Sequence, residues 1–268
     1  MSRILSLFAW LALSAVAQTI QFSAVPEAVI AERLGAYTTK NETREPAIRQ
    51  IFEDAGCGGE ELTEQPVPSL KAPNLICTLP GSAESEIVVG AHFDLVERGH
   101  GVVDNWTGAS LLPSLYQGIV GIPRRHTFRF VAFSGEEKGM LGSKAYVKQL
   151  GKTHEPVIAM VNMDTLGLGE TEIWASHADP MLIRLLGVAA AAVKLPVSVM
   201  NVDQVGSTDS ESFREKKIPA ITIHSLTTQT LPILHSSKDR IEAVDMDKYY
   251  RTYRLVLAYL DVLDHDLE

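Results

Sequence analysis

Histidine and acidic residues follow several apolar runs of this sequence, and their chemistry is that of metal ligands and proton carriers. Imidazole and carboxylate groups bind divalent metal ions such as zinc, and a free carboxylate beside such an ion can act as a general base. Seven candidates lie directly after an apolar run or in the loop beyond one: His92, Asp94, Asp104, Glu136, Glu137, Asp164 and His235.

These candidates include five acids, which would repel one another if they met at one place. Two carboxylates about 4 Å apart repel by about 4 kcal/mol at an effective dielectric constant of about 20. No run of lysine or arginine adjoins them in the sequence. A pair of divalent cations would supply the missing positive charge. The pattern therefore predicts a metal centre.

The elements that must position these side chains alternate along the chain. Strands are expected at residues 74–79, 86–91, 127–133, 157–163, 172–175, 197–202 and 220–224. Helices are expected at 25–37, 42–55, 107–117, 141–150, 180–194 and 210–216, with a long final helix from Met246.

The interior runs predict the fold class. Runs such as 86–91 and 127–133 are apolar on both faces, which is typical of a sheet covered by helices on both sides. We therefore predict a single three-layer α/β domain with a mostly parallel, mixed central sheet. Ligands of such sheets bind beyond the carboxyl ends of the strands, where the seven candidates would meet.

The segment before the first predicted strand is less regular. The helix at 42–55 has Asn41 as a possible N-cap and Gly56 as a stop signal, and a loop rich in proline and glutamate is expected at 58–73. The two helices before Cys57 could cover the sheet or shield the cleft.

Length and charge exclude some classes of protein. The chain has 268 residues, which suits one domain, and its 33 acidic residues exceed its 24 basic ones, giving a net charge of -9. A nucleic-acid backbone would be repelled, so nucleic acid is not an expected partner.

The first residues indicate export. Arg3 precedes an apolar run at 4–16, shorter than the roughly 20 residues that span a bilayer, and a small-residue cleavage site follows it. We predict a signal peptide at 1–17, cleaved after Ala17, and a domain at 18–268 that is secreted or periplasmic and has no membrane anchor. Cys57 and Cys77 are an even pair, which in an oxidising compartment suggests a disulfide.

Five strings of this sequence, taken together, resemble a known family. They are GAHFD at 90–94, GVVDNWTG at 101–108, FSGEE at 133–137 followed by LGS at 141–143, NMD at 162–164, and His235. In this order and approximate spacing they are similar to the co-catalytic dizinc aminopeptidases, of which bacterial leucyl aminopeptidase is typical. The resemblance runs from about Asn74 to the C-terminus.

The resemblance implies a zinc-exopeptidase-like fold and two zinc ions per chain. One ion would be held by His92 and Asp164 and the other by Glu137 and His235, while Asp104 would bridge them. His224, which ends a predicted strand, competes with His235 as a ligand. We favour His235 because the family places an aspartate four residues after its histidine, as Asp239 stands here.

Two further residues receive catalytic roles by the same resemblance. Asp94 would accept the second ring proton of His92 and fix its tautomer. Glu136 would be the general base that takes a proton from the bridging water and passes it to the leaving amine. Neighbouring residues at a strand end point in opposite directions, which would let Glu137 bind metal while Glu136 faces the substrate.

The sequence also departs from the family. Leu234 stands where family members often carry a tyrosine that stabilises the oxyanion. The segment at 206–209 is similar to a family segment near the substrate, so Asp209 is a candidate pocket residue, although Ser210 replaces the usual histidine or tyrosine.

The predicted function is that of a zinc-dependent aminopeptidase acting on extracellular or periplasmic peptides. A glutaminyl-peptide cyclase, which shares the fold but uses one zinc, is the first alternative. A dizinc carboxypeptidase is the next, but the short gap between His92 and Asp104 suits the aminopeptidases better. The alternative that is not an enzyme is a catalytically silent module in which zinc has a structural role.

Overall fold

The structure is a computed structural model that describes residues 20–153 and 156–267. The predicted signal peptide at 1–17 lies outside the described residues. Among the helices that are described, none combines the length and the apolar character needed to cross a membrane.

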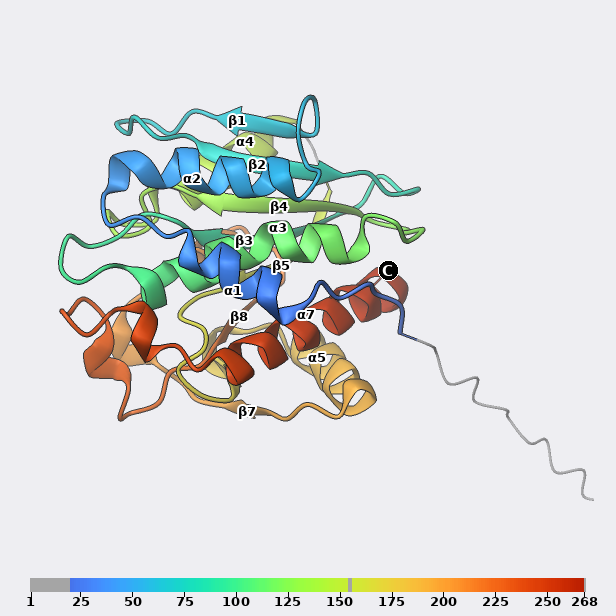
Figure 1. Cartoon of the computed structure of the whole chain (residues 1–268). Helices are drawn as coiled ribbons and strands as arrows, with labels where there is room; N and C mark the ends of the chain where they lie inside the picture. Colours follow the sequence, from blue (N-terminus) through green and yellow to red (C-terminus); the bar gives the residue numbers. More distant parts are fainter. Residues whose placement is uncertain (1–19, 154–155, 268) are drawn as a thin grey trace, which may run out of the picture.

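A mixed sheet of eight strands forms the centre of the described chain (Figure 1). The strands are β1 (Leu62–Gln65), β2 (Asn74–Leu79), β3 (Glu86–His92), β4 (Thr127–Phe133), β5 (Val157–Met163), β6 (Thr171–Ile173), β7 (Val197–Val199) and β8 (Ala220–His224). Their order in the sheet is β1-β2-β4-β3-β5-β8-β6-β7. The four central strands β4, β3, β5 and β8 are parallel, so their carboxyl ends reach the same edge.

Helices cover both faces of this sheet, and the alternation of side chains along each strand explains why. In β3, Ile87 and Val89 pack into one core while Val88 packs into the other. Figure 1 shows α1, α2, α3 and α7 in front of the sheet and α4 behind it. The larger core contains α1 (Glu27–Gly35), α2 (Asn41–Asp54), α3 (Thr107–Ile119), α5 (Pro180–Val193) and α7 (Met246–Asp266), and the smaller contains α4 (Leu141–Thr153) and α6 (Ser210–Arg214).

The three-layer α/β fold and the central strands are as predicted, whereas the N-terminal region differs from the prediction in two respects. The predicted loop at 58–73 contains β1, a short edge strand paired with β2. Asn41 is not an N-cap. It is the first residue of α2, after Lys40, and its side chain instead exchanges hydrogen bonds of 2.9 and 3.0 Å with the backbone of Leu95.

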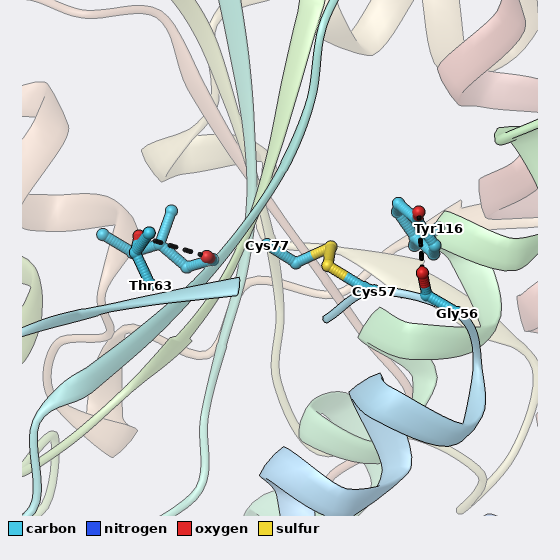
Figure 2. Close-up of a disulfide and its surroundings, with 6 residues drawn as sticks. Gly56, Cys57, Thr63, Cys77 and Tyr116 are labelled. Carbon is cyan, nitrogen blue, oxygen red and sulfur yellow. Dashed lines mark hydrogen bonds between the residues drawn. A yellow bond between two sulfur atoms is a disulfide. The ribbon is translucent and has the colours of Figure 1, made fainter. Parts of the chain in front are cut away.

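Cys57 and Cys77 form the predicted disulfide (Figure 2), with an S–S distance of 2.01 Å. The bond joins the turn after α2 to strand β2, and both cysteines are fully buried. Gly56 ends the helix with a φ of 93°, as its stop signal predicted, and its carbonyl accepts a 3.3 Å hydrogen bond from Tyr116. A cross-link over a loop of this length contributes about 3 kcal/mol to stability.

Candidate metal centre

The carboxyl edge of the sheet brings together side chains from segments far apart in the sequence. His92 ends β3 and Asp164 directly follows β5, while Glu137 lies in the turn after β4. Asp104 belongs to the tight segment Val102–Trp106 before α3, and His235 lies in the loop after β8. The five predicted ligands therefore converge on one place.

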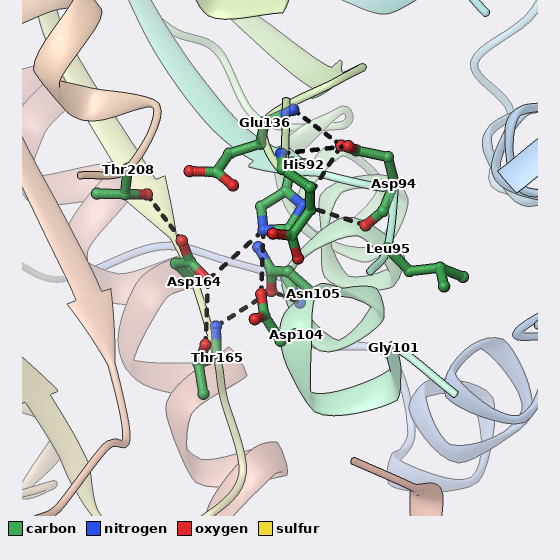
Figure 3. A network of polar contacts seen from close by, with 12 residues as sticks. His92, Asp94, Leu95, Gly101, Asp104, Asn105, Glu136, Asp164, Thr165 and Thr208 are labelled. Atoms are coloured by element: carbon green, nitrogen blue, oxygen red, sulfur yellow. Dashed lines mark hydrogen bonds and ion pairs between the residues drawn. The ribbon is translucent and has the colours of Figure 1, made fainter. Parts of the chain in front are cut away.

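The distances divide these ligands into two groups that share Asp104. In the first, His92 Nε2 is 3.2 Å from Asp104 Oδ1 and 3.8 Å from Asp164 Oδ1 (Figure 3). In the second, His235 Nε2 is 3.1 Å from Asp104 Oδ2 and 3.1 Å from Glu137 Oε2. The two oxygens of Asp104 thus face different histidines, and within each group the ligand atoms lie within 4.8 Å of one another. This is the arrangement that a carboxylate bridging two cations requires.

Unpaired buried atoms support a metal at this place. His92 is 1% exposed, and its Nε2, like Glu137 Oε1, has no hydrogen-bond partner. His92 Nδ1 lies 3.2 Å from the backbone oxygen of Asp94, which makes Nδ1 the protonated nitrogen of the neutral ring. Against the effect of burial, Asp104 and Asp164 raise the pKa of His92, so without a metal the two carboxylates favour a proton on Nε2, and a bound cation would take the place of that proton. Nitrogen and oxygen donors in this combination suit zinc.

Without a metal, the acids and histidines of the site shift one another's pKa. Burial, together with the charge of the neighbouring Asp104, raises the pKa of Glu137 to about 7. Burial, together with the charges of Asp209 and Asp164, raises the pKa of Glu136 to about 10. Against the effect of its burial, the hydrogen bond with His235 and the charge of the nearby His92 ring hold the pKa of Asp104 well below its usual range.

The metal-free protein is expected to lose stability as the pH rises from about 6.5 to 9. The hydrogen bond with Asp104 raises the pKa of His235 from 6.5 to about 9, so protonation of His235 stabilises the fold below pH 6.5 and this contribution disappears by pH 9. Ionisation of Glu137, whose pKa is raised from 4.5 to about 7, also destabilises the fold as the pH rises, but mainly between pH 4.5 and 7. Urea unfolding in the presence of a chelator would measure the trend, and a stability that rises over this range would contradict it.

Asp94 organises the site from behind the ligands. Its backbone oxygen and its Oδ1 lie 3.2 and 3.5 Å from His92 Nδ1 (Figure 3). Its carboxylate also accepts hydrogen bonds of 3.0 and 3.2 Å from the backbone N–H groups of Glu136 and Glu137. Asp94 therefore lies beside Nδ1 of His92, with its backbone oxygen nearer than its carboxylate, and the carboxylate also holds the glutamate turn.

The expected strand alternation of Glu136 and Glu137 is wrong. Strand β4 ends at Phe133, and the pair lies three residues later in a turn. Turn geometry and the two hydrogen bonds to Asp94, rather than the pleat of a strand, set the directions of the two side chains.

The segment that carries Asp104 is held from both sides. Asp239, 2% exposed, accepts hydrogen bonds of 2.7 and 3.3 Å from the backbone N–H groups of Val103 and Asp104. Asn105 donates a 2.8 Å bond to the backbone oxygen of Met163, at the end of β5. The Asp104–Asn105 peptide is cis. Asp239, four residues after His235, thus connects the loop of His235 to the segment of Asp104, two of the three segments that supply the second ligand group.

A cavity adjoins the ligands. Site acids line one part of it, and a small apolar cluster of Trp174, Val202 and Leu226 lines another. Leu234, at the position where the family often has tyrosine, adds a further apolar wall.

His224 also lines the cavity but is not placed as a ligand. Its Nε2 lies 2.9 Å from the backbone oxygen of Met200, and its Nδ1 accepts a 3.0 Å bond from the N–H of Leu226. Burial lowers its pKa to about 4, so the ring is neutral. The geometry supports the preference for His235.

Asp209 does not line the cavity. It is fully buried, and its neighbours Ser207 and Thr208 take that position. Sequence reasoning missed Thr208, whose hydroxyl donates a 2.7 Å hydrogen bond to Asp164 and accepts one of 2.7 Å from Asn162. Thr208 stands beside Asp209 in the segment at 206–209, but a threonine in a loop is too common a residue to indicate a role at the site.

Comparison with known proteins identifies the family. The model of peptidase family M28 matches residues 74–260, about seven-tenths of the sequence, and the chain belongs to this family. A probable leucine aminopeptidase of Arthroderma benhamiae is 27% identical over 201 residues, which cover 70% of this chain and 56% of the relative. The chain therefore spans little more than half the length of that relative.

Solved structures share the fold. The LapA aminopeptidase of Legionella pneumophila has a TM-score of 0.78 at 21% identity and covers 91% of this chain and 73% of its own. BSAP, a zinc aminopeptidase of Bacillus subtilis, has a TM-score of 0.63 at 24% identity, with coverages of 70% and 49%. The glutaminyl cyclase of Fimbriiglobus ruber has a TM-score of 0.72 at 16% identity, with coverages of 90% and 97%.

Proposed function

We propose that this protein is a zinc-dependent aminopeptidase that hydrolyses the N-terminal peptide bond of peptides outside the cytoplasm. The observation that carries the proposal is the pair of ligand groups joined by Asp104 at the carboxyl edge of the sheet. Membership of peptidase family M28 supports the reaction, and the names of similar aminopeptidases support the type of bond.

Two zinc ions fit the donor set. His92 and Asp164 would hold one, Glu137 and His235 the other, and Asp104 would bind both. Bound zinc would supply Lewis-acid activation of water and of the scissile carbonyl. The surrounding acids would then have their counter-charge, and the carboxylates would be ionised at neutral pH.

Glu136 is the proposed general base. It lines the cavity beside the ligands, and its backbone N–H is held by Asp94. Positive charge at the site would lower its pKa from the high value caused by burial among acids. Its carboxylate would take a proton from the attacking water and deliver it to the amine that leaves.

The cavity suggests the kind of side chain accepted at the N-terminal position. Trp174 and Leu226 provide apolar surface, and the neutral His224 adds no charge. An apolar first residue would remove water from these walls without leaving a buried charge unpaired. The similar protein named as a leucine aminopeptidase agrees with this preference.

Action outside the cytoplasm is also part of the proposal. The Cys57–Cys77 disulfide is of a kind that persists in oxidising compartments. The predicted signal peptide at 1–17 would deliver the chain there. Analysis of the N-terminus of the exported protein would test the expected cleavage after Ala17.

The cyclase alternative rests on the similarity of the fold to a glutaminyl cyclase. Both activities can be assayed on one preparation with a panel of aminoacyl anilides and an N-terminal glutaminyl peptide, each with and without a chelator. We expect chelator-sensitive hydrolysis of apolar anilides, and about two zinc ions per chain by elemental mass spectrometry. Cyclisation with one zinc ion would favour the cyclase, and zinc binding without either activity would favour a silent binding module.

A further inference from the structure

A buried arginine from the N-terminal helices lies beneath the metal-binding segments. Arg44, on α2, is fully buried. One of its terminal nitrogens donates a 2.9 Å hydrogen bond to the backbone oxygen of Phe93, and the other donates bonds of 2.7 Å to those of His100 and Gly101. Its Nε donates a further 2.9 Å bond to the backbone oxygen of Thr38. One planar guanidinium therefore connects three separate stretches of chain.

Two of these stretches carry ligands of the proposed metal centre. Phe93 stands between His92 and Asp94, and Gly101 begins the turn that leads to Asp104. Fixing the carbonyl oxygens of Phe93 and Gly101 relative to one planar group also fixes the spacing between the two ligand segments. We call Arg44 and the carbonyl oxygens that it binds the clamp. Its geometry matters because His92 and Asp104 would have to bind the same metal ion.

The residues around the clamp leave room for the guanidinium and pack against it. Gly101 has a φ of 59°, and a Cβ there would lie 2.9 Å from an Arg44 nitrogen. The indole of Trp106, two residues after Asp104, lies under the guanidinium at 5.3 Å, and its Nε1 donates a 3.2 Å bond to the backbone oxygen of Arg33 on α1. Both N-terminal helices thus contact the Asp104 segment.

The hydrogen bonds of Arg44 go to neutral carbonyl oxygens, which do not neutralise its positive charge. The charge therefore attracts the nearby carboxylates, such as those of Asp239 and Asp94. Burial lowers its pKa to about 10, while Asp239 and Asp94 raise it, and the group stays protonated at neutral pH. A buried cation held only by carbonyl oxygens is costly, which is acceptable where many acids lie nearby. The helix that supplies it lies outside the 74–260 region matched by the family model.

We propose that Arg44 is a positioning residue for the metal centre: it holds the segments of His92 and Asp104 at the spacing that zinc binding requires. This inference rests on the proposed function, because it assumes that the site binds zinc. Helix α2 then contributes to the metal affinity in addition to packing in the larger core.

The test compares Arg44→Ala with Arg33→Ala in the full chain. Arg33 is 9% exposed, and its side chain donates bonds of 2.8 and 2.7 Å to Ser114 and Gln117 on α3, away from the metal ligands. Both variants should lose stability in urea unfolding of the metal-free protein. Zinc affinity, measured by competition with a chromophoric chelator, should fall about 10- to 100-fold in Arg44→Ala alone. Equal affinities in the two variants would overturn the proposal.

Two further measurements separate positioning from charge or general damage. A low, non-denaturing concentration of guanidinium chloride should restore zinc affinity to Arg44→Ala, whereas sodium chloride at the same ionic strength should not. Arg44→Lys keeps the charge, but a single ammonium group cannot bind the four carbonyl oxygens that the planar guanidinium binds, so its zinc affinity should stay low. Full affinity in Arg44→Lys, or no rescue by guanidinium, would overturn the clamp. Failure of the unmodified protein to bind zinc would instead refute the proposed function.

Discussion

Replacing the carboxylate of Glu136 with an amide is expected to lower kcat about 1000-fold while the zinc content stays unchanged. The amide keeps the size of the side chain but cannot accept the proton of the attacking water at neutral pH. The proposed ligand atoms belong to other residues, and the turn hydrogen bond from Glu136 to Asp94 uses the backbone, so the site should keep its shape.

The measurement for Glu136→Gln is kcat on an apolar aminoacyl anilide, with zinc determined on the same sample. Glu170→Gln is a matched control, because Glu170 is 41% exposed and pairs with Lys248 on the surface. The control should keep full activity. Turnover preserved in Glu136→Gln would remove this residue as the general base, and loss of zinc would mean that it is a ligand.

Removing the shared ligand should have the other large effect. Asp104→Ala is expected to weaken zinc binding at least about 100-fold and to abolish peptidase activity. This loss is larger than that typical of substituting a residue that only hydrogen-bonds to a ligand. The reason is geometric: its two oxygens lie 3.2 and 3.1 Å from His92 and His235, so one substitution removes a ligand from both groups.

Chelator competition would measure the zinc affinity of Asp104→Ala, again beside Glu170→Gln. Substitution of a ligand that serves only one ion would leave the other bound. Retention of one zinc at unchanged affinity would therefore show that Asp104 belongs to a single group, and retention of both would remove it from the site.

The residues that form the candidate site could be predicted because the rule that locates them is simple. Strands β3, β4 and β5 are apolar on both faces, so they must lie inside the sheet, and parallel strands end at one edge. Polar residues directly after such strands, such as His92 and Asp164, are therefore neighbours whatever the details of the loops. Short edge strands carry a weaker pattern, and the residues of β1 therefore predict a loop although they form a strand.

The contacts that hold the site could not be predicted in the same way. Arg44 reaches Gly101 over 57 positions of sequence, and Thr208 reaches Asp164 over 44. Such contacts leave no periodic pattern, since one arginine or threonine on a helix or loop is an ordinary residue. The double role of Asp94 likewise depends on where the glutamate turn lies in space.

The sequence by itself determined the three-layer α/β architecture, the identity of the candidate ligands and the edge of the sheet where they meet. These depend on apolar periodicity and residue type, which are local properties of the chain. Only the tertiary structure decided that His235 rather than His224 faces Asp104, that Asp209 is buried and does not line the cavity, and that Arg44 on α2 holds two ligand segments. Those outcomes depend on the directions of side chains brought together by folding, which the order of residues does not specify.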